Sequence, residues 1–250
     1  MDRHDALTVG AIAVLAAITV TVSHEAVGHG GTCLAVGGEV VLLTSSLFRC
    51  SAGSSLIDLG GPLVNFAIGL IALLTSSKLA MGRPGLRLGL ILMAGFAGFW
   101  EGGYLVRAMA TREGDLYTAG AAFIGSPDAS WRILGGVLGV VIYAGAVVLV
   151  RRGIGRLGDA RRVARISWVA AMFATVCAAL VYRGGLGADL RDATLEIGVA
   201  SAPLLFLNPR GPAEAAPVIS RNRLIWLLAS GAFIAFTLTM GRGIGAQWVN

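Results

Sequence analysis

The sequence is poor in charge, because only 14% of its 250 residues are Asp, Glu, Lys or Arg while 56% are hydrophobic. With a mean hydropathy of +0.77, this composition excludes an ordinary water-soluble domain and indicates a polytopic membrane protein. Aromatic residues do not interleave with the basic ones on a polar surface, so nucleic acid is not an expected partner. The formal charge of +6 is expected to mark cytoplasmic loops and to contact lipid headgroups.

Cysteine is scarce as well. The chain has three cysteines, Cys33, Cys50 and Cys177, and none of them forms a C-x-x-C pair, so a cysteine zinc site is not indicated. Cys33 and Cys50 flank a short segment that we expect outside the cytoplasm. A disulfide between them and two free, buried thiols both remain open at this point.

Long polar segments are also missing, and six apolar runs dominate the chain instead. They lie at roughly Ala6–Val36, Leu56–Ser76, Leu86–Ala110, Ile133–Val150, Ile166–Tyr182 and Leu224–Met240. We therefore predict an all-α polytopic membrane protein with about six transmembrane helices, forming a single transmembrane domain over residues 1–250. The metal-site half is expected at about 1–125, with additional helices at about 126–250.

Two segments between the runs are too short to span. Residues 37–50 are bounded by glycines and partly β-branched, which predicts one or two strands, as a hairpin at the membrane surface. An irregular loop is the alternative. The stretch Leu195–Leu207 is apolar but short, and we expect it to be re-entrant or interfacial. A lid over the metal site is an equal alternative.

The strongest orientation signal is the segment 151–165, which carries six arginines against one aspartate. Cytoplasmic loops carry such an excess of basic residues. Counting crossings from this loop in both directions places both termini in the cytoplasm. We expect an integral protein of the bacterial inner membrane in this orientation.

The chemistry-bearing motif is His24-Glu25-Ala26-Val27-Gly28-His29, at the downstream end of the first apolar run. A charged side chain at the bilayer centre costs about 2.5–3.5 kcal/mol, so ionisable groups at membrane depth are functional candidates. Histidine nitrogens are zinc ligands, and an adjacent glutamate can act as general base. The alternative is a pair of histidines in ordinary interhelical hydrogen bonds, with Glu25 as their partner.

The spacing of this motif is H-E-x-x-x-H, one residue longer than the familiar H-E-x-x-H. On a regular helix a separation of four residues leaves two rings about 40° apart, whereas five residues leave them about 140° apart. A π-bulge closes residues five apart, and Gly28 would ease that distortion. We therefore predict that the helix is irregular between Glu25 and His29.

Two carboxylates are candidates for a third metal ligand, Asp115 and Glu101. Asp115 follows the downstream end of the third run. Because consecutive crossings are antiparallel, this end lies on the same side of the membrane as the downstream end of the first run. We expect Asp115 to approach both histidines more closely than Glu101 or Asp58 does. The alternatives are a solvated loop acid for Asp115 and an ion pair with Arg107 or another basic group for Glu101.

The second run opens with Gly61-Pro62-Leu63-Val64-Asn65. The order of histidine motif, strand-like segment and this G-P-x-x-N resembles the intramembrane zinc metalloproteases of the site-2 protease family. The chain looks like a short, divergent member with H-E-x-x-x-H in place of H-E-x-x-H. The resemblance covers about the first half of the sequence.

The resemblance implies a Zn²⁺ cofactor, with His24 and His29 as metal ligands and Glu25 as the catalytic base. Gly61, Pro62 and Asn65 would lie close to the active site and support it. Gly114-Asp115 looks like the glycine-aspartate at the corresponding helix end in some short relatives, which favours Asp115 as the third ligand.

The implied function is hydrolysis of peptide bonds in membrane-embedded protein segments. The partners would then be a membrane protein or peptide substrate and the lipid bilayer. The alternative is a non-enzymatic membrane protein: a metal-binding or transport bundle, or an inactive protease-like binder of membrane partners. Dependence of cleavage on the glutamate separates the two classes.

Overall fold

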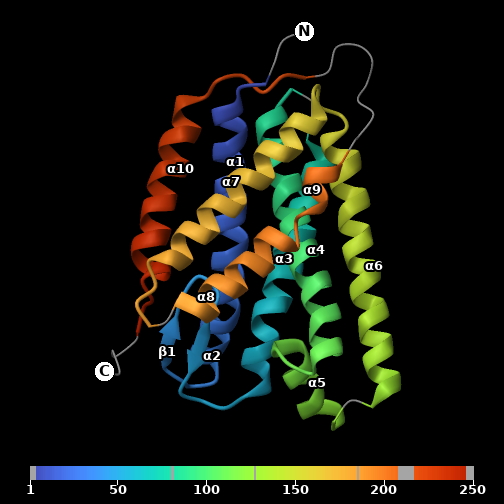
Figure 1. Ribbon diagram of the computed structural model, residues 1–250, viewed down its shortest axis with the longest axis vertical. Helices are drawn as coiled ribbons and strands as arrows, with labels where there is room; N and C mark the ends of the chain where they lie inside the picture. The colour runs from blue at the N-terminus through green and yellow to red at the C-terminus, as the bar shows by residue number, and fades with distance from the viewer. Residues whose placement is uncertain (1–3, 80–81, 127, 185, 208–216, 246–250) are drawn as a thin grey trace.

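The computed structural model describes residues 4–79, 82–126, 128–184, 186–207 and 217–245. Six helices within these residues are long and apolar enough to cross a membrane (Figure 1). They are Ala6–Ala35, Ser55–Lys78, Pro84–Thr111, Ala129–Ile154, Ala160–Leu180 and Arg223–Gly241. The predicted class, an all-α polytopic membrane protein with six transmembrane helices, is confirmed.

The elements follow one another along the chain in a simple order. They are α1 (Ala6–Val22), η1 (Ser23–Gly30), α2 (Gly31–Ala35), β1 (Val40–Leu43), β2 (Phe48–Cys50), α3 (Ser55–Lys78), α4 (Pro84–Thr111), α5 (Asp115–Ile124), α6 (Ala129–Ile154), α7 (Ala160–Leu180), α8 (Leu186–Ala193), η2 (Thr194–Val199), α9 (Pro203–Phe206), α10 (Arg223–Phe236) and η3 (Thr237–Gly241). The η elements are π-helical turns that continue the preceding helix.

Side-chain caps set where several of these helices begin. The side chain of Asp5 accepts a backbone N–H at the start of α1, and Asp128 accepts that of Trp131 at the start of α6. Such a cap stabilises a helix by about 1 kcal/mol. Asp128 explains why α6 begins at Ala129, one turn before the predicted boundary at Ile133.

Helix α4 lies inside the bundle, where it packs against α1, α3 and α6, while α1 also packs against α7 and α10 (Figure 1). The core is formed by buried apolar side chains from α1, α4, α6 and α7, including Val9, Phe96, Val150 and Val163. Only 17% of the most apolar stretch of α6 and 22% of that of α10 are buried. Their large exposed apolar faces suit contact with lipid.

Elements α1, η1 and α2 form one continuous helix along the bundle. An antiparallel hairpin follows it at one end of the bundle (Figure 1). In this hairpin Leu43 of β1 lies opposite Phe48 of β2. The predicted strands are therefore confirmed, and the irregular-loop alternative is wrong. Cys33 and Cys50 form a disulfide with a Cα–Cα distance of 5.9 Å, which ties β2 to α2.

The segment from α8 to α9 is a short, broken helical strap that packs against α4 and α7. Asp189 anchors its start, because its carboxylate accepts hydrogen bonds from the hydroxyls of Thr44 (2.7 Å) and Ser46 (2.8 Å) in the hairpin turn. The ring N–H of Trp168 donates to the carbonyl of Gly198 further along. The strap is not among the helices long enough to span, and its depth in the bilayer stays a prediction.

Candidate metal centre

The two histidines are brought to one face by a π-helical turn. Residues Ser23–Gly30 form this turn, so the predicted irregularity between Glu25 and His29 is confirmed. A π turn closes residues five apart, as the longer motif requires. The Nε2 atoms of His24 and His29 consequently face each other at 3.1 Å.

Glycines let helix α3 approach this turn closely. A Cβ atom on Gly28 would lie 2.5 Å from the Cα atom of Gly61 and 2.6 Å from the carbonyl oxygen of Gly60. Backbone therefore meets backbone where the two helices cross, which only glycine permits. The contact brings the Gly61 backbone against the facing histidine nitrogens.

The other nitrogen of each ring is held by an acceptor. His24 Nδ1 lies 2.9 Å from a carboxylate oxygen of Glu101, and His29 Nδ1 lies 2.7 Å from the carbonyl oxygen of Ile57. Both partners are acceptors, which favours the tautomers with hydrogen on Nδ1, and each neutral ring of this kind would present a lone pair at Nε2. Two lone pairs at this distance repel unless a cation or a proton lies between them.

Asp115 approaches the same point. Its Oδ2 atom lies 3.3 Å from His29 Nε2 and 4.0 Å from His24 Nε2, and the candidate ligand atoms all lie within 4.8 Å of one another. Two nitrogens bound tetrahedrally to zinc at about 2.0–2.1 Å lie about 3.3–3.4 Å apart. The atoms of His24, His29 and Asp115 are thus close enough together to hold a metal ion, and the residue types are ones that zinc accepts.

The start of α5 fixes Asp115. Its backbone N–H donates to the hydroxyl of Tyr104 at 3.0 Å, and Gly114 before it has a φ of 93°, which favours glycine. A Cβ atom on Gly114 would also lie 2.5 Å from the Tyr104 hydroxyl. Burial acts to raise the pKa of Asp115, but hydrogen bonding to His29 and the nearby histidine charge hold that pKa below its usual value.

The expectation about Glu101 is wrong for one histidine. Glu101 lies 2.9 Å from His24, whereas Asp115 lies 4.0 Å from it, although among the described residues Asp115 is the acid in contact with His29. The reason is that an imidazole has two nitrogens. Glu101 binds Nδ1, on the side of the ring away from the facing Nε2 atoms, and there it orients the ring.

The alternative for Glu101, an ion pair with Arg107, is not found among the described residues. The amide of Asn65 donates to the same Glu101 oxygen at 2.8 Å, and Arg107 instead pairs with Asp192 at 3.6 Å. Asn65 and Glu101 are both fully buried. Pro62 lies buried in α3, the helix that carries Asn65. Because proline has no N–H, the backbone hydrogen bonding of this part of α3 is weakened.

Aromatic rings cover the two histidines. Trp100 stacks on His24 with ring centroids 4.4 Å apart, and Phe48 of the hairpin stacks on His29 at 5.6 Å. Glu25 is buried and interacts electrostatically with both histidines. Within the described part of the chain its carboxylate makes no hydrogen bond, which leaves both oxygens available to a substrate or water.

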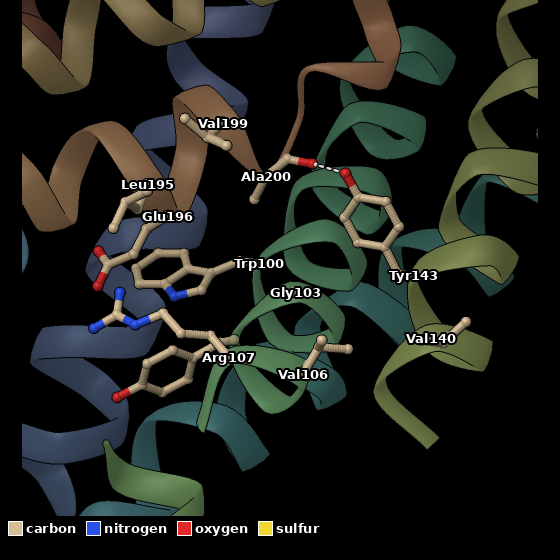
Figure 2. Close-up of a pocket in the computed structure, with 11 residues that line it drawn as sticks. Trp100, Gly103, Val106, Arg107, Val140, Tyr143, Leu195, Glu196, Val199 and Ala200 are labelled. Atoms are coloured by element: carbon tan, nitrogen blue, oxygen red, sulfur yellow. Dashed lines mark hydrogen bonds between the residues drawn. The ribbon is translucent and has the colours of Figure 1, made fainter. Parts of the chain in front are cut away.

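A cavity of about 420 Å³ lies beside the metal centre, with Trp100 and Tyr104 in its wall (Figure 2). The rest of its wall is mainly apolar and comes from α4, α6 and η2. The hydroxyl of Tyr143 donates to the carbonyl of Ala200 at 2.7 Å and so joins α6 to the strap. This shape and polarity suit an apolar side chain.

One end of this cavity is charged. Figure 2 shows the side chains of Arg107 and Glu196 pointing toward one another there. Burial, reinforced by the nearby Glu25 carboxylate, raises the pKa of Glu196 well above its usual value. Tyr104 joins this cavity to the metal centre, because it lines the cavity and its hydroxyl accepts the backbone N–H of Asp115.

Glu196 was not among the site residues predicted from the sequence. Its signal was an acid within the short apolar stretch Leu195–Leu207, where an ionisable side chain is costly. Trp100 was not predicted to cover His24 either, since a tryptophan in an apolar run has no distinctive pattern. Comparisons of the chain with family models, curated proteins and solved structures gave no match.

We expect Gly61→Ala to abolish metal binding without removing any ligand. The added Cβ would lie 2.7 Å from His24 Nε2 and closer still to His29 Nε2, in the space that an ion needs. Elemental analysis of the purified protein measures this loss. Gly136→Ala is the matched control, because a Cβ there meets open space. Stoichiometric zinc in Gly61→Ala would contradict the placement of the site.

Proposed function

We propose that this protein is an intramembrane zinc metallopeptidase that hydrolyses peptide bonds in membrane-embedded protein segments. The observation that carries the proposal is the convergence of two Nε2 lone pairs and the Asp115 carboxylate beside the buried Glu25. This donor set occurs in a bundle of six helices that could cross a membrane. The order of motifs that resembles the site-2 protease family supports the same function.

The residues divide the chemistry among themselves. His24, His29 and Asp115 would hold a zinc ion, which supplies a Lewis acid for a peptide carbonyl and for the attacking water. Glu25 would accept the proton of that water and return it to the leaving amine. Glu101 holds the ring of His24 in the required tautomer by its bond to Nδ1.

The cavity beside Trp100 would receive a bulky apolar side chain of the residue next to the scissile bond. An extended substrate would pair with β2, whose Phe48 stacks on His29, and would thus run past the metal centre. The other strand is less available, because Leu43 of β1 already exchanges backbone hydrogen bonds of 2.9 and 2.8 Å with Ile244.

The metal centre would lie toward the extracytoplasmic side of the bacterial inner membrane, with both termini in the cytoplasm. The arginine-rich loop follows α6 at the end of the bundle away from the hairpin (Figure 1). The disulfide between Cys33 and Cys50 lies at the metal-centre end, and disulfides persist in oxidising compartments. The two signals thus agree.

We expect Glu25→Gln to keep the metal and to lose proteolysis by about a hundredfold or more, because an amide cannot accept the proton from water. The assay is cleavage of a co-reconstituted library of single-span substrates, with zinc measured on the same samples. His24→Ala is the companion variant and should lose the metal. If wild type binds zinc yet cleaves no better than Glu25→Gln, the non-enzymatic alternative is correct.

We expect Gly103→Leu to reduce cleavage of substrates with Leu or Phe beside the scissile bond by about tenfold or more, and of Ala substrates much less. Gly103 lines the cavity, and a Cβ there makes only ordinary contacts, 3.7 Å from the ring of Tyr143. Gly136→Leu, which faces open space, is the control. An equal loss for all substrates would show that the cavity is not a side-chain subsite.

We expect alkaline phosphatase fused within the loop at 155–159 to be inactive, and the same reporter fused between β1 and β2 to be active. The enzyme folds only outside the cytoplasm, so its activity reports the side of the membrane. Green fluorescent protein at the same positions gives the reciprocal readout. Active phosphatase in the arginine-rich loop would reverse the orientation.

A further inference from the structure

Residues of α3, α4 and α6 line a second cavity of about 380 Å³. The end of α3 and the start of α4, where it lies, are at the end of the bundle away from the hairpin (Figure 1). Three arginines line it: Arg87 from the first turn of α4, Arg152 from the last turn of α6, and Arg156 just beyond α6. Ser76 and Ser77, at the end of α3, also line it. None of the described residues that line this cavity is acidic.

The charge of this cavity suits an anion. Arg87 is buried with 7% of its surface exposed, and it shares the cavity wall with Arg152 and Arg156, so the like charges of these guanidinium groups repel one another. An anion between the arginines would turn this repulsion into attraction. Guanidinium groups bind phosphate oxygens through paired hydrogen bonds, which makes a phosphate group the best match.

The deeper part of the cavity is apolar. Leu73 on α3, Ile91 on α4 and Val148 on α6 each lie about one turn, roughly 6 Å, further from the helix ends than the polar residues. Gly145 continues this wall, and a Cβ there would meet open space. All three helices are candidate membrane spans, so the apolar wall would lie at the depth of acyl chains.

We infer that this cavity is a binding site for an anionic phospholipid. Its phosphate lies among Arg87, Arg152 and Arg156, and one acyl chain follows the apolar wall toward Gly145. A free phosphate ion would use the arginines but would leave that wall uncovered. The site is independent of the metal centre and of the proposed peptidase function.

Native mass spectrometry of the full chain in neutral detergent tests this site. The probes are phosphatidylglycerol, phosphatidylcholine with the same acyl chains, and inorganic phosphate. We expect one phosphatidylglycerol to bind at least tenfold more tightly than phosphatidylcholine. Removing one arginine charge should weaken phosphatidylglycerol binding about fivefold. The double variant Arg152→Gln with Arg156→Gln should therefore weaken that binding about twenty-fivefold.

Arg151→Gln is the matched control, because it removes the same charge from the adjacent position, which does not line the cavity. It should change phosphatidylglycerol affinity less than twofold. Gly145→Leu should weaken phosphatidylglycerol without affecting a bound inorganic phosphate. Three outcomes would each overturn the proposal. They are equal binding of both lipids, a loss of affinity in Arg151→Gln as large as that in Arg152→Gln, and displacement of the lipid by millimolar phosphate.

Discussion

The two Nε2 atoms of His24 and His29, facing each other at 3.1 Å, are the constraint on which the rest of this structure depends. When both rings are neutral, their two lone pairs repel each other, and a buried acceptor without a partner costs about 1–3 kcal/mol. The fold holds this arrangement because Glu101 and the Ile57 carbonyl fix the opposite nitrogens. A bound cation would relieve the repulsion, so metal binding and stability should be coupled.

The demand for this geometry extends to the backbone. A regular helix would separate the rings, and the first helix instead forms a π turn. Gly28 of this turn packs directly against Gly60 and Gly61 of α3. The hairpin then covers His29 through Phe48, and the disulfide fixes the hairpin to α2. Closing a loop with a sequence separation of 17 residues stabilises a fold by about 3 kcal/mol, which helps to offset the cost of the site.

The ionisable groups are divided between the two ends of the bundle. One end holds the histidines, Glu25, Glu101 and Asp115, and the strap adds Asp189 and Glu196. The other end holds the cavity lined by arginines. Apolar side chains such as Val9 and Phe96 form the core of the bundle. This division keeps the proposed peptidase centre at one end of the bundle and the proposed lipid site at the other.

Much of this could be predicted from the sequence because the relevant signals are local. Apolar run length gives the six spans, and the angle between residues five apart predicts the irregular turn. The tertiary structure alone decided that Cys33 and Cys50 pair, that Glu101 orients His24 while Asp115 faces the Nε2 atoms, and that Glu196 lies in the neighbouring cavity wall. A side chain's type and spacing are local properties, whereas which of two ring nitrogens an acid from another helix reaches depends on how the helices cross.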